Sequence, residues 1–302
     1  MTGTLQERIS ASLAAPVADE VRRFAARLGQ ENDALAVLFY GSNLRTGLLE
    51  GVLDYYVLLP GEPERGIWPR VSYREWVDEE HSLRAKVATM TLEKFHQAAS
   101  GELIDTTIWT RFVQPSALVW KRDEAAEGAV TLSLAAACKT AARLAAVLGP
   151  ERGREEDYWS ALFRATYRAE FRIESAGREQ SILSLNAGHF RGLLPLALNA
   201  AGISFEQAGG ELAPRLDSAE RARVGRWWRK RQMLGKPLNV LRLVRAASTF
   251  EGAARYAAWK VERHSGVKIK LTPWRERHPV LAAPIVLFSL LRARRRDPAK
   301  RS

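Results

Sequence analysis

The sequence predicts an α+β protein, in which a small α/β domain with a mixed sheet is followed by an α-helical domain. Short apolar runs of strand length, bounded by turn residues, lie in the first part of the chain. Helical periodicity dominates from Leu132 onward. A chain of 302 residues can form one large domain or two smaller ones with real cores. We expect domains at residues 1–125 and 126–275, followed by a distinct segment at 276–302.

In the first domain, apolar residues at helical spacing predict a helix over residues 5–29. Residues 72–99 are expected to be helical or mixed. Four short apolar runs have the length and the flanking turn residues of strands. These runs are Leu35–Tyr40, Val52–Leu59, Leu103–Thr110 and Ser116–Lys121.

The second domain is expected to be helical, with residues 203–217 as a loop. Its first segment is Ala-rich and ends at Gly149-Pro150, and Pro195 can introduce a kink in the third. The expected helices are Leu132–Leu148, Asp157–Ser175, Ser181–Asn199, Ser218–Leu234, Leu238–Ala247 and Phe250–Ser265.

The composition is that of a globular protein with a strong excess of positive charge. The formal net charge is +12 and the sequence pI is about 10.1, which favours an acidic partner such as a nucleic acid, an anionic membrane or a phosphorylated substrate. Cys138 is the single cysteine, so an internal disulfide is excluded, and no Cys/His cluster has zinc spacing. The first twenty residues lack the apolar core of a secretion signal, so we expect a reducing compartment.

The C-terminal segment combines an apolar run with a basic tail. Val280–Leu291 is nearly uncharged and contains Pro284, and six Lys or Arg residues follow within 292–301. A membrane-spanning helix needs roughly 20 apolar residues, so this run is too short. A segment that lies in the membrane interface, with its tail attracted to anionic lipid, fits better. The alternative is a core-packing helix with a disordered tail.

A Gly-Ser turn and a downstream aspartate form the most informative pattern. Gly41-Ser42 follows the first expected strand, and Asp54 lies near the start of the second. Glycine lets a backbone approach a phosphate closely, and the Ser42 amide and hydroxyl can donate hydrogen bonds to it. Asp54 offers the oxygen ligand that Mg²⁺ prefers. Strand, turn and carboxylate in this order are typical of a nucleotidyltransferase site.

The same pattern also occurs in α/β proteins where Gly-Ser is only a turn and the aspartate only ends a strand. The usual enzyme has a second carboxylate two residues after the first, and this chain has Tyr56 there. Strand alternation places Tyr56 on the face of Asp54, so we expect it to line the same site. Two other acids are candidates for the second metal ligand. They are Asp105, on an expected neighbouring strand where it could equally be a surface charge, and Glu170.

Three further features have both a functional and a structural interpretation. Arg226–Arg231 interleaves Trp with positive charge, which suits base stacking or lipid headgroups, but also a helix whose Trp face packs inward. His189 on an apolar helix is more often a satisfied core or surface residue. Lys139 lies in an apolar helix, where a buried ammonium costs free energy unless it meets an anion.

Several segments, taken in order, resemble one family, the mitochondrial-type phosphatidate cytidylyltransferases, which are peripheral CDP-diacylglycerol synthases. The Tyr-Gly-Ser-Gly turn and Leu-Asp-Phe strand of that family look like Tyr40–Asn43 and Leu53–Tyr55 here. The family also lacks the acid at the position of Tyr56. Further family segments look like Lys139–Ala141, Ala169–Arg172 and Asn186–Arg191, and the basic stretch for membrane association looks like Ala253–Ser265 and the tail.

The resemblance covers roughly residues 35–275 and implies CTP, Mg²⁺ and phosphatidate, with CDP-diacylglycerol and pyrophosphate as products. It implies catalytic roles for Asp54, Ser42 and Lys139. It assigns nucleotide binding to Tyr40, Gly41, Ser42, Lys139, Arg172 and His189, and metal binding to Asp54. For the second metal-binding carboxylate we expect Glu170, from a family segment, or Asp105, from its position in the sequence. Asn43 in place of a family glycine and Glu170 in place of an aspartate leave the fine substrate preference open.

We therefore expect a peripheral membrane phosphatidate cytidylyltransferase at the cytoplasmic face of a bacterial inner membrane, or at the matrix face in a mitochondrion. Its partners are expected to be CTP, phosphatidate and an anionic membrane surface reached by the C-terminal segment, with no nucleic acid. The alternatives are a nucleotidyltransferase that acts on RNA or protein, and a non-catalytic membrane-binding relative. The sequence leaves open the acyl-chain preference, the choice between CTP and dCTP, and the oligomeric state.

Overall fold

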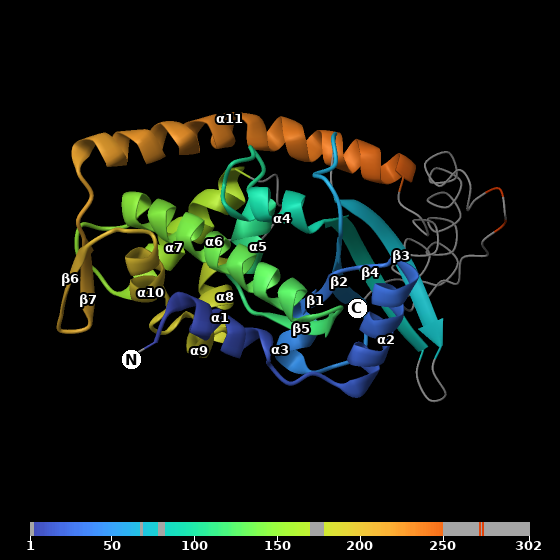
Figure 1. Cartoon of the computed structure of the whole chain (residues 1–302). Helices are drawn as coiled ribbons and strands as arrows, with labels where there is room; N and C mark the ends of the chain where they lie inside the picture. The colour runs from blue at the N-terminus through green and yellow to red at the C-terminus, as the bar shows by residue number, and fades with distance from the viewer. Residues whose placement is uncertain are drawn as a thin grey trace, which may run out of the picture.

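The protein is α+β and contains a mixed five-stranded sheet with helices packed around it (Figure 1). The computed structural model describes residues 3–66, 69–77, 82–169 and 178–249, together with Thr272 and Trp274. The α+β class expected from the sequence is thereby confirmed. The boundary expected near residue 125 between two domains stays a prediction.

The sheet has the strand order β3-β4-β2-β1-β5. Strand β2 pairs in parallel with β4, whereas the pairs β1–β2, β1–β5 and β3–β4 are antiparallel. A separate hairpin is formed by β6 and β7. The strand bounds are β1 Ala36–Tyr40, β2 Leu53–Leu59, β3 Arg70–Val77, β4 Ser82–Thr91, β5 Ser116–Lys121, β6 Phe205–Ala208 and β7 Glu211–Pro214.

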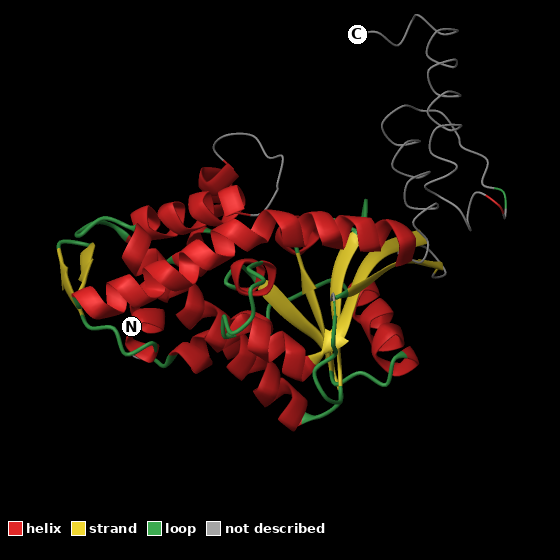
Figure 2. Ribbon diagram, turned by 90° about the horizontal axis from the view of Figure 1, so that it is seen from above, coloured by secondary structure: helices red, strands yellow, loops and turns green. Residues whose placement is uncertain are grey.

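The described helices cover both faces of the sheet (Figure 2). Their bounds are α1 Leu5–Leu13, α2 Asp19–Glu31, α3 Ser42–Thr46, α4 Leu92–Ala99, α5 Thr107–Phe112, α6 Glu124–Leu148, α7 Glu155–Ala169, α8 Arg178–Leu185, α9 Ala187–Phe190, α10 Leu193–Ala200 and α11 Ser218–Thr249.

Alternation along β2 divides the interior into two apolar cores. Tyr55 faces α2, where its ring lies 5.6 Å from that of Phe24. Tyr56 faces the opposite way, into a larger core that runs from the sheet through α4, α5 and α6 to α7 and α10. Asp54 shares the face of Tyr56, because side chains two apart on a strand point the same way. The larger core therefore forms the wall behind the candidate site.

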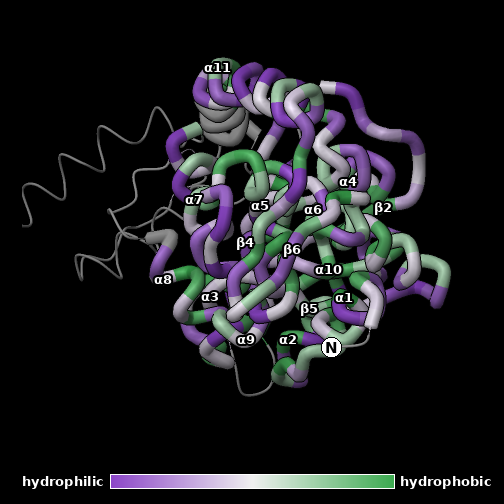
Figure 3. The backbone as a smooth tube through the Cα atoms, turned by 90° about the vertical axis from the view of Figure 1, so that its left-hand side faces the viewer, coloured by the Kyte–Doolittle hydropathy of each residue, from purple (hydrophilic) through white to green (hydrophobic). Residues whose placement is uncertain are grey.

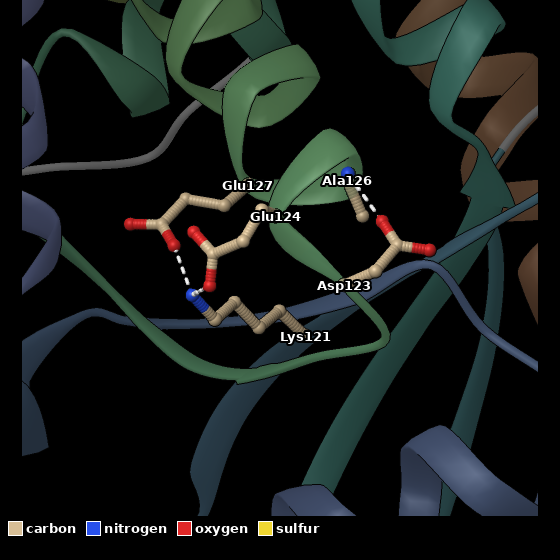
Figure 4. A network of polar contacts seen from close by, with 5 residues as sticks. All are labelled: Lys121, Asp123, Glu124, Ala126 and Glu127. Carbon is tan, nitrogen blue, oxygen red and sulfur yellow. Dashed lines mark hydrogen bonds and ion pairs between the residues drawn. The ribbon is translucent and has the colours of Figure 1, made fainter.

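Helix α6 runs through the middle of the larger core. Asp123 caps its start, where the Asp123 Oδ1 accepts a hydrogen bond of 2.8 Å from the Ala126 amide, and Lys121 bridges Glu124 and Glu127 beside it (Figure 4). Among the described residues, α6 is also the one helix that is long and apolar enough to span a membrane. Its most apolar 18-residue window is 72% buried, so packing inside the protein explains its composition. Figure 3 shows α11 at the outside of the molecule, with many hydrophilic residues along it.

The first-domain predictions are partly confirmed. β1, β2 and β5 lie where the sequence placed strands, but residues 5–29 form two helices, α1 and α2, which the segment around Pro16 separates. Residues 72–99 form most of β3, then β4 and α4. The predicted strand Leu103–Thr110 is wrong, because residues 107–112 form α5, which buries Ile108, Trp109 and Phe112 at helical spacing.

In the second half, the expected loop 203–217 contains the β6–β7 hairpin. Residues 178–200 form three short helices, which break at Asn186 and at Gly192, whose φ is 75°. Pro195 instead lies in the first turn of α10, where a missing N–H costs little. The two helices expected on either side of residue 236 form the single helix α11, with Pro237 inside it.

Several predictions lie outside the described residues. They include the roles of Glu170 and Arg172, the end of the helix expected to reach Ser175, and the helix Phe250–Ser265. The apolar run Val280–Leu291 and the basic tail lie outside them as well.

Candidate functional site

The candidate site begins with a row of residues that cross the sheet in register. Tyr40 at the end of β1 pairs with Asp54 near the start of β2, and Asp54 pairs with Lys86 on β4. Residues that pair directly across strands project their side chains from the same face, about 5 Å apart. Asp54, Lys86 and Tyr40 are each half-buried. The register therefore gathers a carboxylate, an ammonium and a phenol at one end of the sheet.

Gly41 forms the turn that follows β1. Its φ of 91° and ψ of −160° lie in a region that is essentially restricted to glycine. A Cβ atom at this position would also lie 2.9 Å from the Asp54 Oδ2. The backbone thus passes directly against the carboxylate, and any larger residue would separate the two. The pairing of turn and aspartate expected from the sequence is present.

The residues after the glycine have two different roles. Ser42 is exposed at the start of α3, where the first amides of a helix have no partner within that helix. Asn43 is buried, and its Nδ2 donates to the Leu48 carbonyl at 2.7 Å and to the Glu50 carbonyl at 2.9 Å. Asn43 therefore fixes the loop between α3 and β2, which gives a physical reason for the side chain at this position.

The pKa of Asp54 is raised above its usual range because burial disfavours its charged form. Lys86 and Arg111 oppose this effect with their positive charge, but they do not cancel it. Since the pKa rises despite two nearby cations, the carboxylate is under-solvated and would gain from a further positive ligand.

Arg111 is the second cation of the site and comes from the last turn of α5. Its Nη1 donates to the Tyr56 hydroxyl at 3.0 Å. Its guanidinium carbon lies 5.4 Å from the centre of the Tyr40 ring and 5.9 Å from that of Tyr56. Tyr56 is fully buried, so its hydroxyl offers a fixed acceptor. Tyr56 therefore lies on the face of Asp54, as strand alternation predicts, and its hydroxyl has a cation as its partner.

His189 reaches the same end of the sheet from α9. Its Nε2 lies 2.9 Å from the carbonyl of Val113, two residues after Arg111. Burial lowers the pKa of His189, and the Val113 carbonyl partly opposes this shift. The bond holds a proton on Nε2 and fixes the ring beside α5. A role in binding nucleotide stays a prediction.

The structure does not join the other expected residues to this group by any described contact. Lys139 is half-buried on α6, so water reaches part of its side chain and the argument from a buried ammonium weakens. Asp105 is not on a strand; it precedes α5, and its Oδ1 accepts from the Thr107 amide at 2.8 Å and the Thr107 hydroxyl at 2.6 Å. Asp105 precedes α5 and Arg111 lies near its end, so the two residues are roughly 9 Å apart along the helix axis.

Sequence reasoning missed Lys86 and Arg111. Lys86 is a charged residue among the apolar positions of β4, on the face of Tyr56. It was missed because the sequence pattern predicts residues 72–99 only as helical or mixed, without strand positions. Arg111 was missed because the residues before it, Leu103–Thr110, were predicted to form a strand. Within the described residues, no group of three His, Cys, Asp or Glu side chains is close enough to hold a metal.

The aromatic and basic segment Arg226–Arg231 packs into the protein. Trp228 is 3% exposed, and the rings of Trp227 and Trp228 lie 5.9 and 6.4 Å from that of Trp109. Arg231 is buried and donates to the Gly101 and Leu103 carbonyls. Of the interpretations open from the sequence, the structure supports the inward-packed helix.

Comparison with known proteins adds no relative. No protein-family model matches the chain, and no curated protein matches it. The residues and their geometry therefore carry the functional argument.

Proposed function

We propose that the protein is a Mg²⁺-dependent phosphatidate cytidylyltransferase that acts at a membrane surface. It would convert CTP and phosphatidate to CDP-diacylglycerol and pyrophosphate. The observation that carries the proposal is the contact between the Gly41 turn and Asp54, because a phosphate held by this turn would lie beside the carboxylate. The ordered motifs of the sequence supply the choice of CTP and phosphatidate.

The residues at Asp54 fit a magnesium ion. Mg²⁺ is commonly held by one or two carboxylates together with substrate phosphates and water, so a single described carboxylate is sufficient for a nucleotide-bound ion. The raised pKa of Asp54 indicates an anion that lacks solvation, and a cation would relieve this. When bound, Mg²⁺ would neutralise the triphosphate and stabilise charge on the oxygens that enter and leave.

The chain itself would bind and orient the reactants. Gly41 and Ser42 would hold nucleotide phosphates with backbone amides and the serine hydroxyl. An oxygen of the phosphatidate phosphate would attack the α-phosphorus in line, as the bond from that phosphorus to the pyrophosphate oxygen breaks. A phosphate monoester is largely ionised at neutral pH, so no general base is required. Catalysis would rest on positioning and charge neutralisation.

A lipid substrate also needs apolar surface close to the phosphate turn. A cavity of about 180 Å³ lies against α3, and Asn43 is the one polar side chain among its lining residues. Leu48, at its rim, is 57% exposed. The cavity lies on the α2 side of the sheet with Val21 and Phe39, opposite the face of Asp54, so it does not extend the proposed phosphate site. Its lining residues are Pro16, Val17, Ala18, Val21, Phe39, Asn43, Leu44, Gly47, Leu48 and Leu49.

The alternative of RNA as the substrate loses its main support, because Trp227 and Trp228 pack against Trp109. The direct test uses purified protein with CTP, Mg²⁺ and phosphatidate in mixed detergent micelles, with CDP-diacylglycerol as the measured product. We expect lipid-dependent product from the wild type and none above background from Asp54→Ala. Equal turnover by the two proteins would refute the site, and no product from the wild type would refute the reaction.

A further inference from the structure

We propose that Arg111 binds the terminal phosphates of the nucleotide and that Tyr56 is the residue that positions it. This inference rests on the proposed nucleotidyl transfer and adds to it a second element of the phosphate site. No motif in the sequence singled out Arg111, and its assignment follows from the geometry around Asp54.

The position of Arg111 is the first argument. Tyr56 stands where a second carboxylate would be usual, and its buried hydroxyl accepts a hydrogen bond of 3.0 Å from the Arg111 Nη1. The rings of Tyr40 and Tyr56 lie within 6 Å of the same guanidinium. The chain has thus replaced a potential metal ligand by a group that fixes a cation. An ordered guanidinium loses less freedom on binding than a mobile one.

The local charge is the second argument. Ionised Asp54 contributes −1, and Lys86 and Arg111 contribute +1 each, so the three groups together carry +1. Two cations thus lie beside one carboxylate at this end of the sheet, and such cations suit the oxygens of a phosphate.

The chemistry of the group is the third argument. A guanidinium is a planar fork of N–H donors, and that of Arg111 is oriented by its bond to the Tyr56 hydroxyl. The fork matches the oxygens of a phosphate in a bidentate contact. Arg111 is half-buried, so part of its side chain is exposed to solvent, and its guanidinium lies over the ring of Tyr40, the residue before the Gly41 turn. A triphosphate that extends from the Gly41 turn would meet it.

The test measures binding of CTP, CDP and CMP in the presence of Mg²⁺ and without lipid, by titration calorimetry. We expect Arg111→Gln to lower the affinity for CTP about ten- to a hundredfold, as the loss of a charged hydrogen bond would. The affinity for CMP should fall less than threefold, since CMP lacks the terminal phosphates. Arg143→Gln is the matched control: it removes the same charge from an exposed arginine that contacts Ala201, and it should leave all three affinities unchanged.

Two further variants keep the inference falsifiable if Arg111→Gln fails to fold. Arg111→Lys keeps the charge but not the fork, and Tyr56→Phe keeps the ring but not the acceptor. In each variant, the affinity for CTP should fall several-fold more than the affinity for CMP. Equal losses for CTP and CMP, or CTP affinity in all three variants like that of the Arg143→Gln control, would overturn the role of Arg111 while the wild type still binds CTP. A wild type that binds none of the three nucleotides would overturn the proposed function and this inference together.

Discussion

Arg231 and Arg111 both lie over aromatic rings, and their surroundings differ. Arg231 lies 3.8 Å from the centre of the Trp227 ring and is only 3% exposed. It donates to three backbone carbonyls, those of Gly101, Leu103 and Trp227. Arg111 lies over Tyr40 and Tyr56, is half-buried, and has the Asp54 carboxylate and the exposed Ser42 turn nearby.

The difference separates a structural arginine from a candidate ligand-binding one. Burial lowers the pKa of Arg231 to about 10, and its carbonyl partners connect α11 to the loop before α5. Arg111 is held by side chains, at the end of the sheet where the backbone approaches a carboxylate. Figure 1 places α11 and α3 on opposite sides of the molecule. Cation–aromatic contact alone thus does not indicate function; solvent access and the neighbouring groups do.

The largest effect is expected at Asp54. Asp54→Asn should lower turnover at least about a thousandfold, because the carboxylate is the proposed ligand of the ion that stabilises the transition state. The free energy of unfolding should stay level or rise, since burial already disfavours the charged form. Product formation and urea denaturation of the same preparation measure both quantities. A variant that loses activity only because it unfolds would contradict a functional role for this cluster.

Arg231→Met should produce the opposite result. The substitution removes the donor to the Leu103 carbonyl and one of the two donors to the Gly101 carbonyl, which keeps Trp227 Nε1, so we expect a loss of about 1–3 kcal/mol in the free energy of unfolding. CTP affinity of the folded protein should not change. Urea denaturation and calorimetry test this, and a loss of CTP affinity without a loss of stability would reverse the two assignments.

Gly41→Ala should affect both stability and activity. The backbone conformation at Gly41 costs a residue with a Cβ about 1–3 kcal/mol, and the new atom would press on the Asp54 Oδ2. Gly202 is the matched control, since its φ is also positive and no atom lies within 4 Å of the added Cβ. We expect Gly202→Ala to lower the melting temperature but to keep turnover. Equal turnover in the two alanine variants would contradict the claim that the turn must contact Asp54.

The smallest effect is a pH dependence of stability. The pKa of Asp54 in the folded state lies above its unfolded value of 3.8, so the folded state binds the proton more tightly. Stability is therefore expected to fall as pH rises from 3.8 through the folded pKa, and then to level off. Asp54→Asn should lack this contribution. Urea titrations of both proteins over this range measure the difference, and parallel pH profiles would show that Asp54 is not desolvated.

The parts of the fold set by local pattern were predictable from the sequence. Strand β5 and the turn at Gly41 have short apolar runs with clear stop signals, and both lie where expected. The strand predicted over residues 103–110 was wrong because Ile108 and Trp109 fit a strand and a helix equally well. Only packing against the larger core selects the helix.

The candidate site was predictable where its residues are close in sequence. Gly41, Ser42 and Asp54 belong to one strand-turn-strand unit. Lys86 and Arg111 join it through the parallel β2–β4 register and the docking of α5, which depend on tertiary contacts. Sequence spacing carries no record of such contacts, so these two residues could not be assigned to the site beforehand.

The most direct test of the account is a structure determined with CTP and Mg²⁺. We expect the triphosphate to lie along the Gly41-Ser42 turn, with the ion on Asp54 and the terminal phosphates against Arg111. Arg231 should keep its carbonyl partners and make no contact with the nucleotide. A nucleotide bound away from Asp54, or one that approaches α11 instead of α5, would contradict the account.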